Sequence, residues 1–279
     1  MRTITRTIYG ARLQSLQYFG LPYTHVNHTT LNEKFDIFPD QRPEPGEMPR
    51  NRYFVIGNRG HRNAVGADGF PLTDELQHQP SDGALFSHLP FILRRVSEDL
   101  SPSERAKYCL RKAVTFNATN YYAYYGKRLD LAQSEPSMLS NVVDLGNTTT
   151  TPFIPSGANL NPTIPNIPPT GAVVTSGDYL SVSTLIDLSL DEADIAELME
   201  VAAIIYGDEK YAIVSEMGVV AGVDKILTGP GGVNYNEVVE AQLTTHITDY
   251  HALKYSNNGL KLTLDVGAVE PLLVVSTGP

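Results

Sequence analysis

The hydrophobic pattern of the C-terminal half predicts a single amphipathic helix. From Leu190 to Gly207 (LDEADIAELMEVAAIIYG), apolar residues recur at the three-to-four-residue spacing of a helix face. A Ser189–Glu192 capping box precedes the segment, and a glycine such as Gly207 is a common helix end. The acidic positions are Asp191, Glu192, Asp194, Glu197 and Glu200. We interpret them as a solvated helix face, and not as a pair of catalytic carboxylates.

Beyond this helix the period becomes two, which predicts antiparallel strands. Apolar residues occupy alternate positions within residues 211–223, 239–247 and 260–266. Asn258-Gly259 has the composition of a tight turn, and GPGG, from Gly229 to Gly232, predicts a loop between strands. The final run, LLVVSTGP, would be an exposed apolar strand unless it pairs, for example with a neighbouring subunit.

The N-terminal half has a less regular pattern, from which we predict short strands, loops and one further helix. Ile4–Tyr9 alternates and predicts an edge strand or an arm, and Arg52–Ile56 (RYFVI) predicts a short strand. The proline-rich Phe35–Arg50 and the glycine-rich Gly57–Phe70 predict loops. A Ser-Pro-Ser-Glu capping box begins a helix predicted over Ser101–Val114.

Neither period is sustained between the two halves, from Asn147 to Gly177. This stretch holds six prolines and no charged residue, so we predict an extended strap. Apolar side chains lie between the prolines at Phe153, Ile154, Ile164 and Ile167. Two interpretations stay open, which are a semi-rigid arm that lays these side chains on a neighbouring surface and a solvated interdomain linker.

These patterns predict an α+β fold in three segments. Residues 1–146 form a mixed α/β basic half, and residues 147–177 form the proline-rich strap. Residues 178–279 form an acidic half with one amphipathic helix and an antiparallel β-sheet.

Charge is distributed unevenly along the chain. Residues 1–133 carry 17 Lys and Arg against 13 Asp and Glu, whereas residues 134–279 carry 4 against 18. Such asymmetry suits oriented docking between subunits and disfavours nucleic acid as a partner of the second half. The chain also has 15 tyrosines and no tryptophan, and tyrosine is favoured at protein interfaces.

The single cysteine, Cys109, excludes an internal disulfide framework and indicates folding in a reducing compartment. On the apolar stripe of the predicted helix, we interpret it as a buried structural thiol and not as a nucleophile. The N-terminus lacks the apolar core of a secretory signal, and no apolar run approaches 18 residues. We therefore expect a soluble protein that does not contact membranes.

Two groups of residues could bind a metal or an anion, and we prefer a structural explanation for both. The HVNH segment spaces His25 and His28 as metal ligands can be spaced, but two histidines are half a site. Arg59, His61 and Arg62 form a basic cluster, but their loop lacks the spacing of a phosphate loop or a dinucleotide fingerprint.

Aromatic and histidine side chains form two further candidates. Four tyrosines precede two cations, at Tyr121, Tyr122, Tyr124, Tyr125, Lys127 and Arg128. Such a group can stack nucleic-acid bases, but it also fits a strand or an interface rim, which we prefer. His246 and His251 are interpreted as structural. We predict no catalytic, cofactor-binding or metal-binding residue, and no enzymatic activity.

Two segments resemble a known class of proteins. Residues His78–Leu131 (HQPSDGALFSHLPFILRRVSEDLSPSERAKYCLRKAVTFNATNYYAYYGKRLDL) resemble a segment of virion structural proteins of large contractile-tailed bacteriophages. The phrase IVSEMGVVAGVDK, Ile213–Lys225, is similar to a strand phrase of phage tail and baseplate-associated components. The resemblance implies a structural subunit of the neck, tail or baseplate that is assembled in the host cytoplasm. It also implies other virion proteins as partners and a symmetric homo-oligomer.

Two alternative functions stay open. The tyrosine clusters and the antiparallel sheet also suit a carbohydrate- or receptor-binding module of a tail, although the absence of tryptophan counts against it. A virion-associated hydrolase would need a nucleophile, a metal site or two poised carboxylates. The residues available for such roles, namely Cys109, the HVNH pair and the acidic helix, each have the structural explanation given above.

Overall fold

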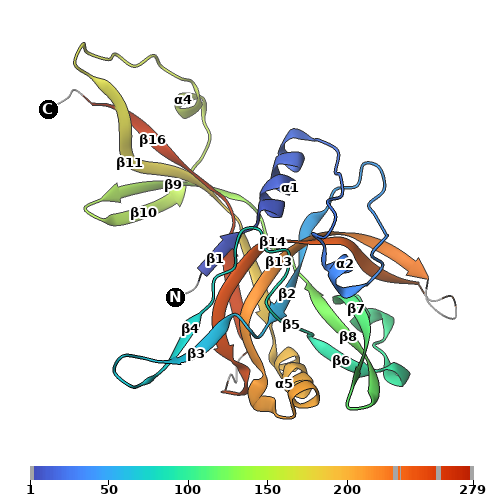
Figure 1. The fold of residues 1–279 in the computed structure, drawn as a ribbon. Helices are drawn as coiled ribbons and strands as arrows, with labels where there is room; N and C mark the ends of the chain where they lie inside the picture. The colour runs from blue at the N-terminus through green and yellow to red at the C-terminus, as the bar shows by residue number, and fades with distance from the viewer. Residues whose placement is uncertain (1–2, 229–231, 233, 256–258, 277–279) are drawn as a thin grey trace. The chain divides into compact units, whose positions relative to one another are not determined.

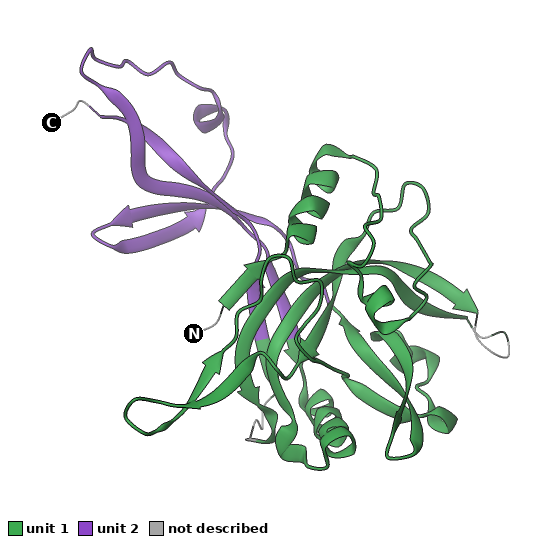
Figure 2. Ribbon diagram, in the orientation of Figure 1, with its two compact units in different colours: residues 1–129, 189–261 green, residues 130–188, 262–279 purple. Residues whose placement is uncertain are grey.

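A computed structural model describes residues 3–228, 232, 234–255 and 259–276 (Figure 1). The fold is a mixed α+β structure with 49% strand and 18% helix, and its sheets are mostly antiparallel. The chain forms two compact units (Figure 2). Unit 1 contains residues 1–129 and 189–261, and unit 2 contains residues 130–188 and 262–279. This division differs from the three consecutive segments expected above, because strands from both halves of the sequence join in unit 1.

Unit 1 is built on an eight-stranded sheet with the order β1-β14-β13-β2-β8-β6, in which β5 also pairs with β2 and β7 with β8. Its strands are β1 Thr3–Arg6, β2 Arg50–Gly57, β5 His88–Leu89, β6 Ile92–Arg95, β7 Tyr108–Phe116, β8 Thr119–Arg128, β13 Ile213–Thr228 and β14 Asn234–Ala252. A separate hairpin consists of β3 His61–Val65 and β4 Pro71–Glu75. The helices are α1 Ile8–Phe19, α2 Leu31–Phe35, α3 Pro102–Arg105 and α5 Glu192–Tyr206, with 3-10 turns at Val96–Glu98, Glu209–Tyr211 and Leu253–Tyr255.

The core of unit 1 lies around the long strands β13 and β14, which pair antiparallel. Residues 214–222 of β13 are all buried, so both faces of this strand are covered. Helices α1 and α2 pack against β14, and α2 contributes Leu31 and Phe35 to a buried hydrophobic cluster. Strands β2, β7, β13 and β14 supply most of the remaining side chains of this cluster. The strands predicted at residues 211–223 and 239–247 are thus confirmed as the centre of the sheet.

Helix α5 confirms the helix predicted from the C-terminal pattern. Its buried residues include Ile195, Leu198 and Ala202, and it ends at Gly207 in the left-handed conformation (φ 81°). The N-terminal cap differs from the expected one, because the capping box is formed by Asp191 and Asp194. The helix therefore begins at Glu192, two residues beyond the predicted start.

The helix predicted over Ser101–Val114 is wrong beyond its first turn. The capping box of Ser101 is present, but α3 ends at Arg105 and strand β7 follows. Leu110 has a positive φ of 55°, and Cys109 and Leu110 are both buried, although the register with β8 is the same on either side of Leu110. The side chain of Glu237 holds the backbone at this position by accepting the Leu110 N–H at 2.8 Å. Tyr108, Cys109 and Leu110 are buried in succession, which breaks the period-two alternation, and the resulting spacing imitates a helix.

The remaining expectations for the N-terminal half have mixed outcomes. The edge strand at the start and the strand at Arg52–Ile56 are confirmed as β1 and β2. The predicted Gly57–Phe70 loop is partly wrong, since it contains β3 of the hairpin. Helix α1 was missed; Thr7 caps its start and Gly20 ends it with a positive φ of 62°.

Unit 2 is built on a four-stranded antiparallel sheet with the order β10-β9-β11-β16. The strands are β9 Ser137–Asp144, β10 Asn147–Pro152, β11 Ala172–Ser183 and β16 Ala268–Ser276, with a one-turn helix α4 at Gly157–Leu160. Strands β12 Leu185–Leu190 and β15 Leu260–Asp265 pair with each other. Two of the three boundaries between the units, after residues 188 and 261, lie within these strands, and the third follows residue 129. β15 confirms the last strand predicted from the alternating pattern.

The prediction that the strap lacks strand structure holds only for its middle part. Its first residues form β10, which pairs with β9, and its last residues form the start of β11. Residues 153–171 between them contain α4 and no strand, and we keep the name strap for this segment. The apolar tail pairs with β11 of the same chain instead of a neighbour. Asn258 and Gly229–Gly231 of the predicted turn and loop, and residues 277–279, lie outside the described residues.

Candidate functional site

Cys109 is a buried thiol, as expected, although it lies on a strand. Only 1% of the residue is exposed, and its sulfur lies against Gly126 of the neighbouring strand. Burial, together with the carboxylate of Glu237, raises the pKa of the thiol well above its ordinary value. Because the thiolate is the nucleophilic form, this environment disfavours catalysis by Cys109.

The two histidines of the HVNH segment have different environments. His25 lies between two carboxylates, with 2.9 Å from Nδ1 to Glu240 and 3.2 Å from Nε2 to Glu33. The Arg42 guanidinium also lies 3.3 Å from the buried Glu240 carboxylate, whereas His28 is exposed. This ionic cluster fixes the segment before α2 to strand β14. Among the described residues, no three His, Cys, Asp or Glu side chains are arranged to hold a metal ion.

The basic residues of the glycine-rich segment interact within the chain. Arg62 forms an ion pair with Asp74 across the β3–β4 hairpin at 3.0 Å. The His61 ring packs on Tyr250, with 4.7 Å between ring centres. Arg62 and His61 thus contact different partners, and Arg59 donates its backbone N–H to a buried carboxylate described below.

The tyrosine cluster lies on strand β8, as predicted, and serves the core and its margin. Tyr124 is fully buried, and Tyr125 stacks on Phe35 with 4.5 Å between ring centres. Arg128, which follows in the same strand, forms an ion pair with Asp224 of β13. A base-stacking surface needs exposed rings, so these contacts favour the structural interpretation.

The acidic helix α5 also uses its carboxylates inside unit 1. Asp194 is buried, accepts the hydroxyl of Tyr108 at 3.2 Å and forms an ion pair with Lys127. Glu197 forms a two-bond ion pair with Arg94, in which one bond is 2.7 Å long. The acidic face is therefore only partly solvated, and it joins the acidic second half of the sequence to the basic first half.

A buried carboxylate that the sequence interpretation missed lies at the centre of β13. The side chain of Glu216 is fully buried and accepts the backbone N–H groups of Phe86 (2.9 Å), Ser87 (3.0 Å) and Arg59 (3.2 Å). His78 adds a contact of 2.8 Å from Nε2. Glu216 thus anchors two loops to the central strand. The available signal was an acidic residue inside the apolar run IVSEMGVV.

The histidines around Glu216 form a closed network. His78 stacks between Phe86 and His246, at 3.9 and 4.0 Å between ring centres. Its Nδ1 lies 3.2 Å from the Asp82 carboxylate, and His246 contacts the Asp82 backbone carbonyl at 3.0 Å. The resulting Asp-His-Glu arrangement resembles part of a catalytic site, but both rings are buried, and no hydroxyl or thiol side chain among the described residues bonds to them. We therefore assign this network a structural role.

Acid should destabilise unit 1 through a neighbouring histidine. Burial, and secondarily the Lys34 cation, lowers the pKa of His88 to about 3. In the unfolded chain His88 binds a proton below about pH 6.5, whereas in the folded chain it stays neutral until about pH 3. The free energy of unfolding therefore falls as pH decreases from 6.5 toward 3. At pH 4.5 we expect a loss of about 3 kcal/mol from this group, at 1.36 kcal/mol per pH unit.

Urea unfolding of the native chain and of His88→Gln between pH 7 and 4.5 measures this effect. Glutamine can still accept the Leu85 N–H that His88 accepts at 3.1 Å. The comparison also separates His88 from Glu237, whose raised pKa acts with the opposite sign. The same pH dependence in both chains would contradict the assignment to His88.

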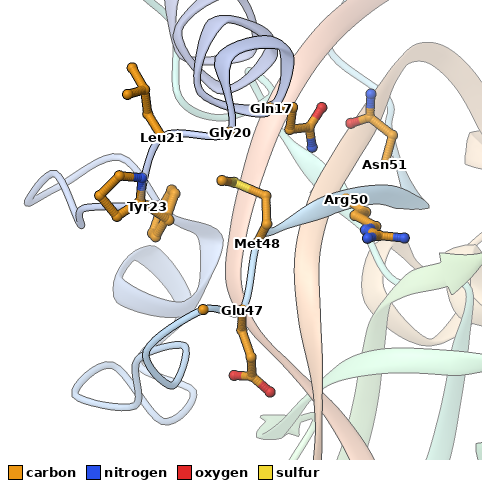
Figure 3. A pocket seen from close by; sticks show the side chains of 10 residues that line it. Gln17, Gly20, Leu21, Tyr23, Glu47, Met48, Arg50 and Asn51 are labelled. Atoms are coloured by element: carbon orange, nitrogen blue, oxygen red, sulfur yellow. The ribbon is translucent and has the colours of Figure 1, made fainter.

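An open hollow of about 770 Å³ lies between the end of α1 and the segment before β2 (Figure 3). Several polar side chains of its lining are engaged elsewhere. Gln17 donates to the Pro49 carbonyl at 2.8 Å, and Glu47 pairs with Lys225 at 2.7 Å. The lining offers Met48 and other apolar surface, but no acid–base pair or nucleophile of the kind that hydrolysis requires. It suits a contact better than a reaction.

The sheet of unit 2 has two apolar faces. Directly opposed residues of antiparallel strands share a face, so the register assigns each side chain. Face A carries Leu139, Val143, Val173, Tyr179, Val269, Leu273 and Val275. Face B carries Met138, Val142, Val174, Leu180, Val182, Leu272 and Val274.

Both faces are uncovered over much of their area. On face A, Val269 is 62% exposed and Leu273 64%, and on face B, Met138 is 50% exposed and Val274 47%. A β-sheet normally buries at least one face against a second layer. Extended exposed apolar surface of this kind marks a site of interaction with another macromolecule. The unit 2 sheet is therefore the best candidate for a functional site among the described residues.

Comparison with known proteins identifies the family. Residues 1–278 match the "Family of unknown function (DUF7208)", and the chain belongs to this family. No curated protein and no solved structure matches the chain. None of the described helices is long and apolar enough to span a membrane.

Proposed function

We propose that this protein is a non-enzymatic structural subunit of a tailed-phage virion, in the neck, tail or baseplate. The observation that supports a structural role is the unit 2 sheet, which exposes apolar side chains on both faces. Covering these side chains with neighbouring subunits would remove apolar surface from water at about 25 cal/mol per Å². A subunit of a larger assembly satisfies this requirement, whereas a freely diffusing enzyme does not.

The virion context rests on the two segments that resemble phage structural proteins. One of them, Ile213–Lys225, forms most of the buried central strand β13. Its apolar character and its buried Glu216 are features of the core, so this resemblance concerns the fold of unit 1. The first segment, His78–Leu131, contains β8, which also belongs to the sheet of unit 1.

The charge asymmetry supports the proposal less than the sequence suggested. The ion pairs Arg94–Glu197, Lys127–Asp194 and Arg128–Asp224 join the basic and acidic halves inside unit 1. These charges are already compensated within one chain. We therefore place the principal docking surface on the charge-poor sheet of unit 2 and on the strap.

Replacing the apolar side chains of the strap should impair incorporation into particles. Ile154 is 75% exposed and Ile164 94%, so Ile154→Ser/Ile164→Ser/Ile167→Ser should fold normally. If the strap is an arm, these isoleucines are buried against a neighbouring subunit in the assembly. Losing all three should then reduce incorporation more than tenfold. The control is Thr163→Ser/Asn166→Ser/Thr170→Ser in the same segment. Equal incorporation of both variants would support the solvated-linker interpretation instead.

Peptide mass spectrometry of gradient-purified particles, with capsids and tails separated, tests the proposed function. We expect the chain in the neck or tail fraction at a fixed copy number per particle that is a multiple of three or six. Absence from purified particles would refute the virion assignment.

A further inference from the structure

The unit 2 sheet needs a cover on each of its two faces. A two-fold dimer joins the same face of both copies, so it would cover face A or face B and leave the other exposed. Packing face A of one copy on face B of the next covers both faces with a single kind of partner. Such a heterologous contact closes into a ring when the rotation between copies permits.

The two faces suit each other chemically. The paired residues of face A include no charged side chain, and those of face B include only Asp144 and Glu270. Packing the faces together would therefore bury few charges, and unpaired buried charges are the costly ones. A surface this poor in charge offers little for recognition by a strongly charged partner such as nucleic acid.

The faces also differ in shape. Face A contains an open hollow of about 380 Å³, whose lining includes Leu139, Tyr179 and Val269. Short side chains lie at its base, where Asn141 contacts Ser181 at 2.9 Å and Thr150 at 2.8 Å. These hydrogen bonds satisfy Asn141, Ser181 and Thr150 within the sheet. The lining also includes Asp265, whose carboxylate accepts the Ser183 hydroxyl at 2.7 Å, so the hollow can accept apolar side chains beside one charged group. The apolar side chains of face B include Met138 and Leu180.

We infer that the unit 2 sheets of several copies of this chain pack face A on face B in a closed ring. The arrangement is that of blades in a β-propeller, where four-stranded sheets pack face to face around an axis, typically four to eight of them. The sheets would lie about 10 Å apart, as packed sheets do. This inference deepens the proposed function and rests on it for the setting in which the ring forms.

Cysteine cross-linking tests the ring, because the one native cysteine is buried. Val269→Cys places a thiol on face A and Val182→Cys places one on face B, at adjacent levels of the sheet. A bismaleimide with a reach of about 10 Å should join the two thiols across the interface. It is applied to the full chain and to particles that contain the variants, with Cys109 retained as a buried internal control.

Each outcome decides the inference. The double variant should give a ladder on denaturing gels that ends at one closed oligomer. On the same gels, each single variant should show only the monomer band, because its thiol has no partner thiol across the interface. A mixture of the two single variants should show monomer and cross-linked dimer bands only. Dimers from Val269→Cys alone would overturn the inference in favour of a two-fold contact. No cross-link in the double variant, in solution or in particles, would overturn it as well.

The same experiment separates the ring from the proposed function. Stoichiometric presence in particles without the A-to-B cross-link would refute the ring and leave the virion role. A cross-linked ring of a chain that is absent from particles would refute the virion role and leave the ring.

Discussion

Replacing Glu216 with alanine is expected to lower the free energy of unfolding of unit 1 by about 3–5 kcal/mol. The carboxylate accepts three backbone N–H groups and contacts His78, all in the buried centre of the sheet. Its removal leaves these donors buried without an acceptor, and it leaves a cavity in the core. A loss of this size is a large fraction of the 5–15 kcal/mol that stabilises an ordinary domain.

Urea unfolding monitored by circular dichroism measures the change, with Glu98→Ala as the matched control. Glu98 belongs to the same unit and is exposed, so its replacement should change stability by about 0.5 kcal/mol or less. A loss below about 1 kcal/mol for Glu216→Ala would show that the carboxylate does not anchor the two loops.

The second large effect is expected from charges placed on the unit 2 sheet. Val269→Asp/Leu273→Asp adds two carboxylates to face A at positions that are more than 60% exposed in the single chain. The isolated chain should therefore fold. In the assembly each carboxylate would be buried without a partner, at a cost of several kcal/mol, so incorporation should fall to background.

The control for this variant is Val65→Asp, in the hairpin of unit 1. Val65 is 74% exposed and lies outside both the sheet and the strap, so incorporation should be unchanged. Quantitative peptide mass spectrometry of purified particles compares the two variants. Normal incorporation of the double variant would exclude face A as an assembly surface.

The sequence predicted the C-terminal elements well because their patterns are local. The stripe of α5 and the alternation of β13, β14 and β15 can each be recognised within a window of a few turns or strand residues. The Ser101–Val114 helix failed for a non-local reason. The backbone of Leu110, which has a positive φ, is held by Glu237 from a strand far along the chain, and no local pattern reveals that contact.

The functional sites were harder to predict because they depend on pairing. Glu216 was visible only as an acid within an apolar strand, and its partners come from two distant loops. The unit 2 sheet left a clearer signal, since β11 and β16 carry apolar residues at both odd and even positions. That composition is typical of strands covered on both faces. Within unit 2, the described residues supply no second layer for it, and only the structure reveals this.

Hydroxyl-radical footprinting of the assembled protein tests the central claim most directly. It compares side-chain oxidation in the isolated chain and in purified particles, at Leu273 of face A and Met138 of face B, with Val65 as the reference. Both positions are at least half exposed in the single chain. If neighbouring subunits cover the sheet, oxidation of Leu273 and Met138 should fall severalfold in particles while Val65 is unchanged. Equal oxidation in the two samples would contradict the assignment of the sheet as an assembly surface.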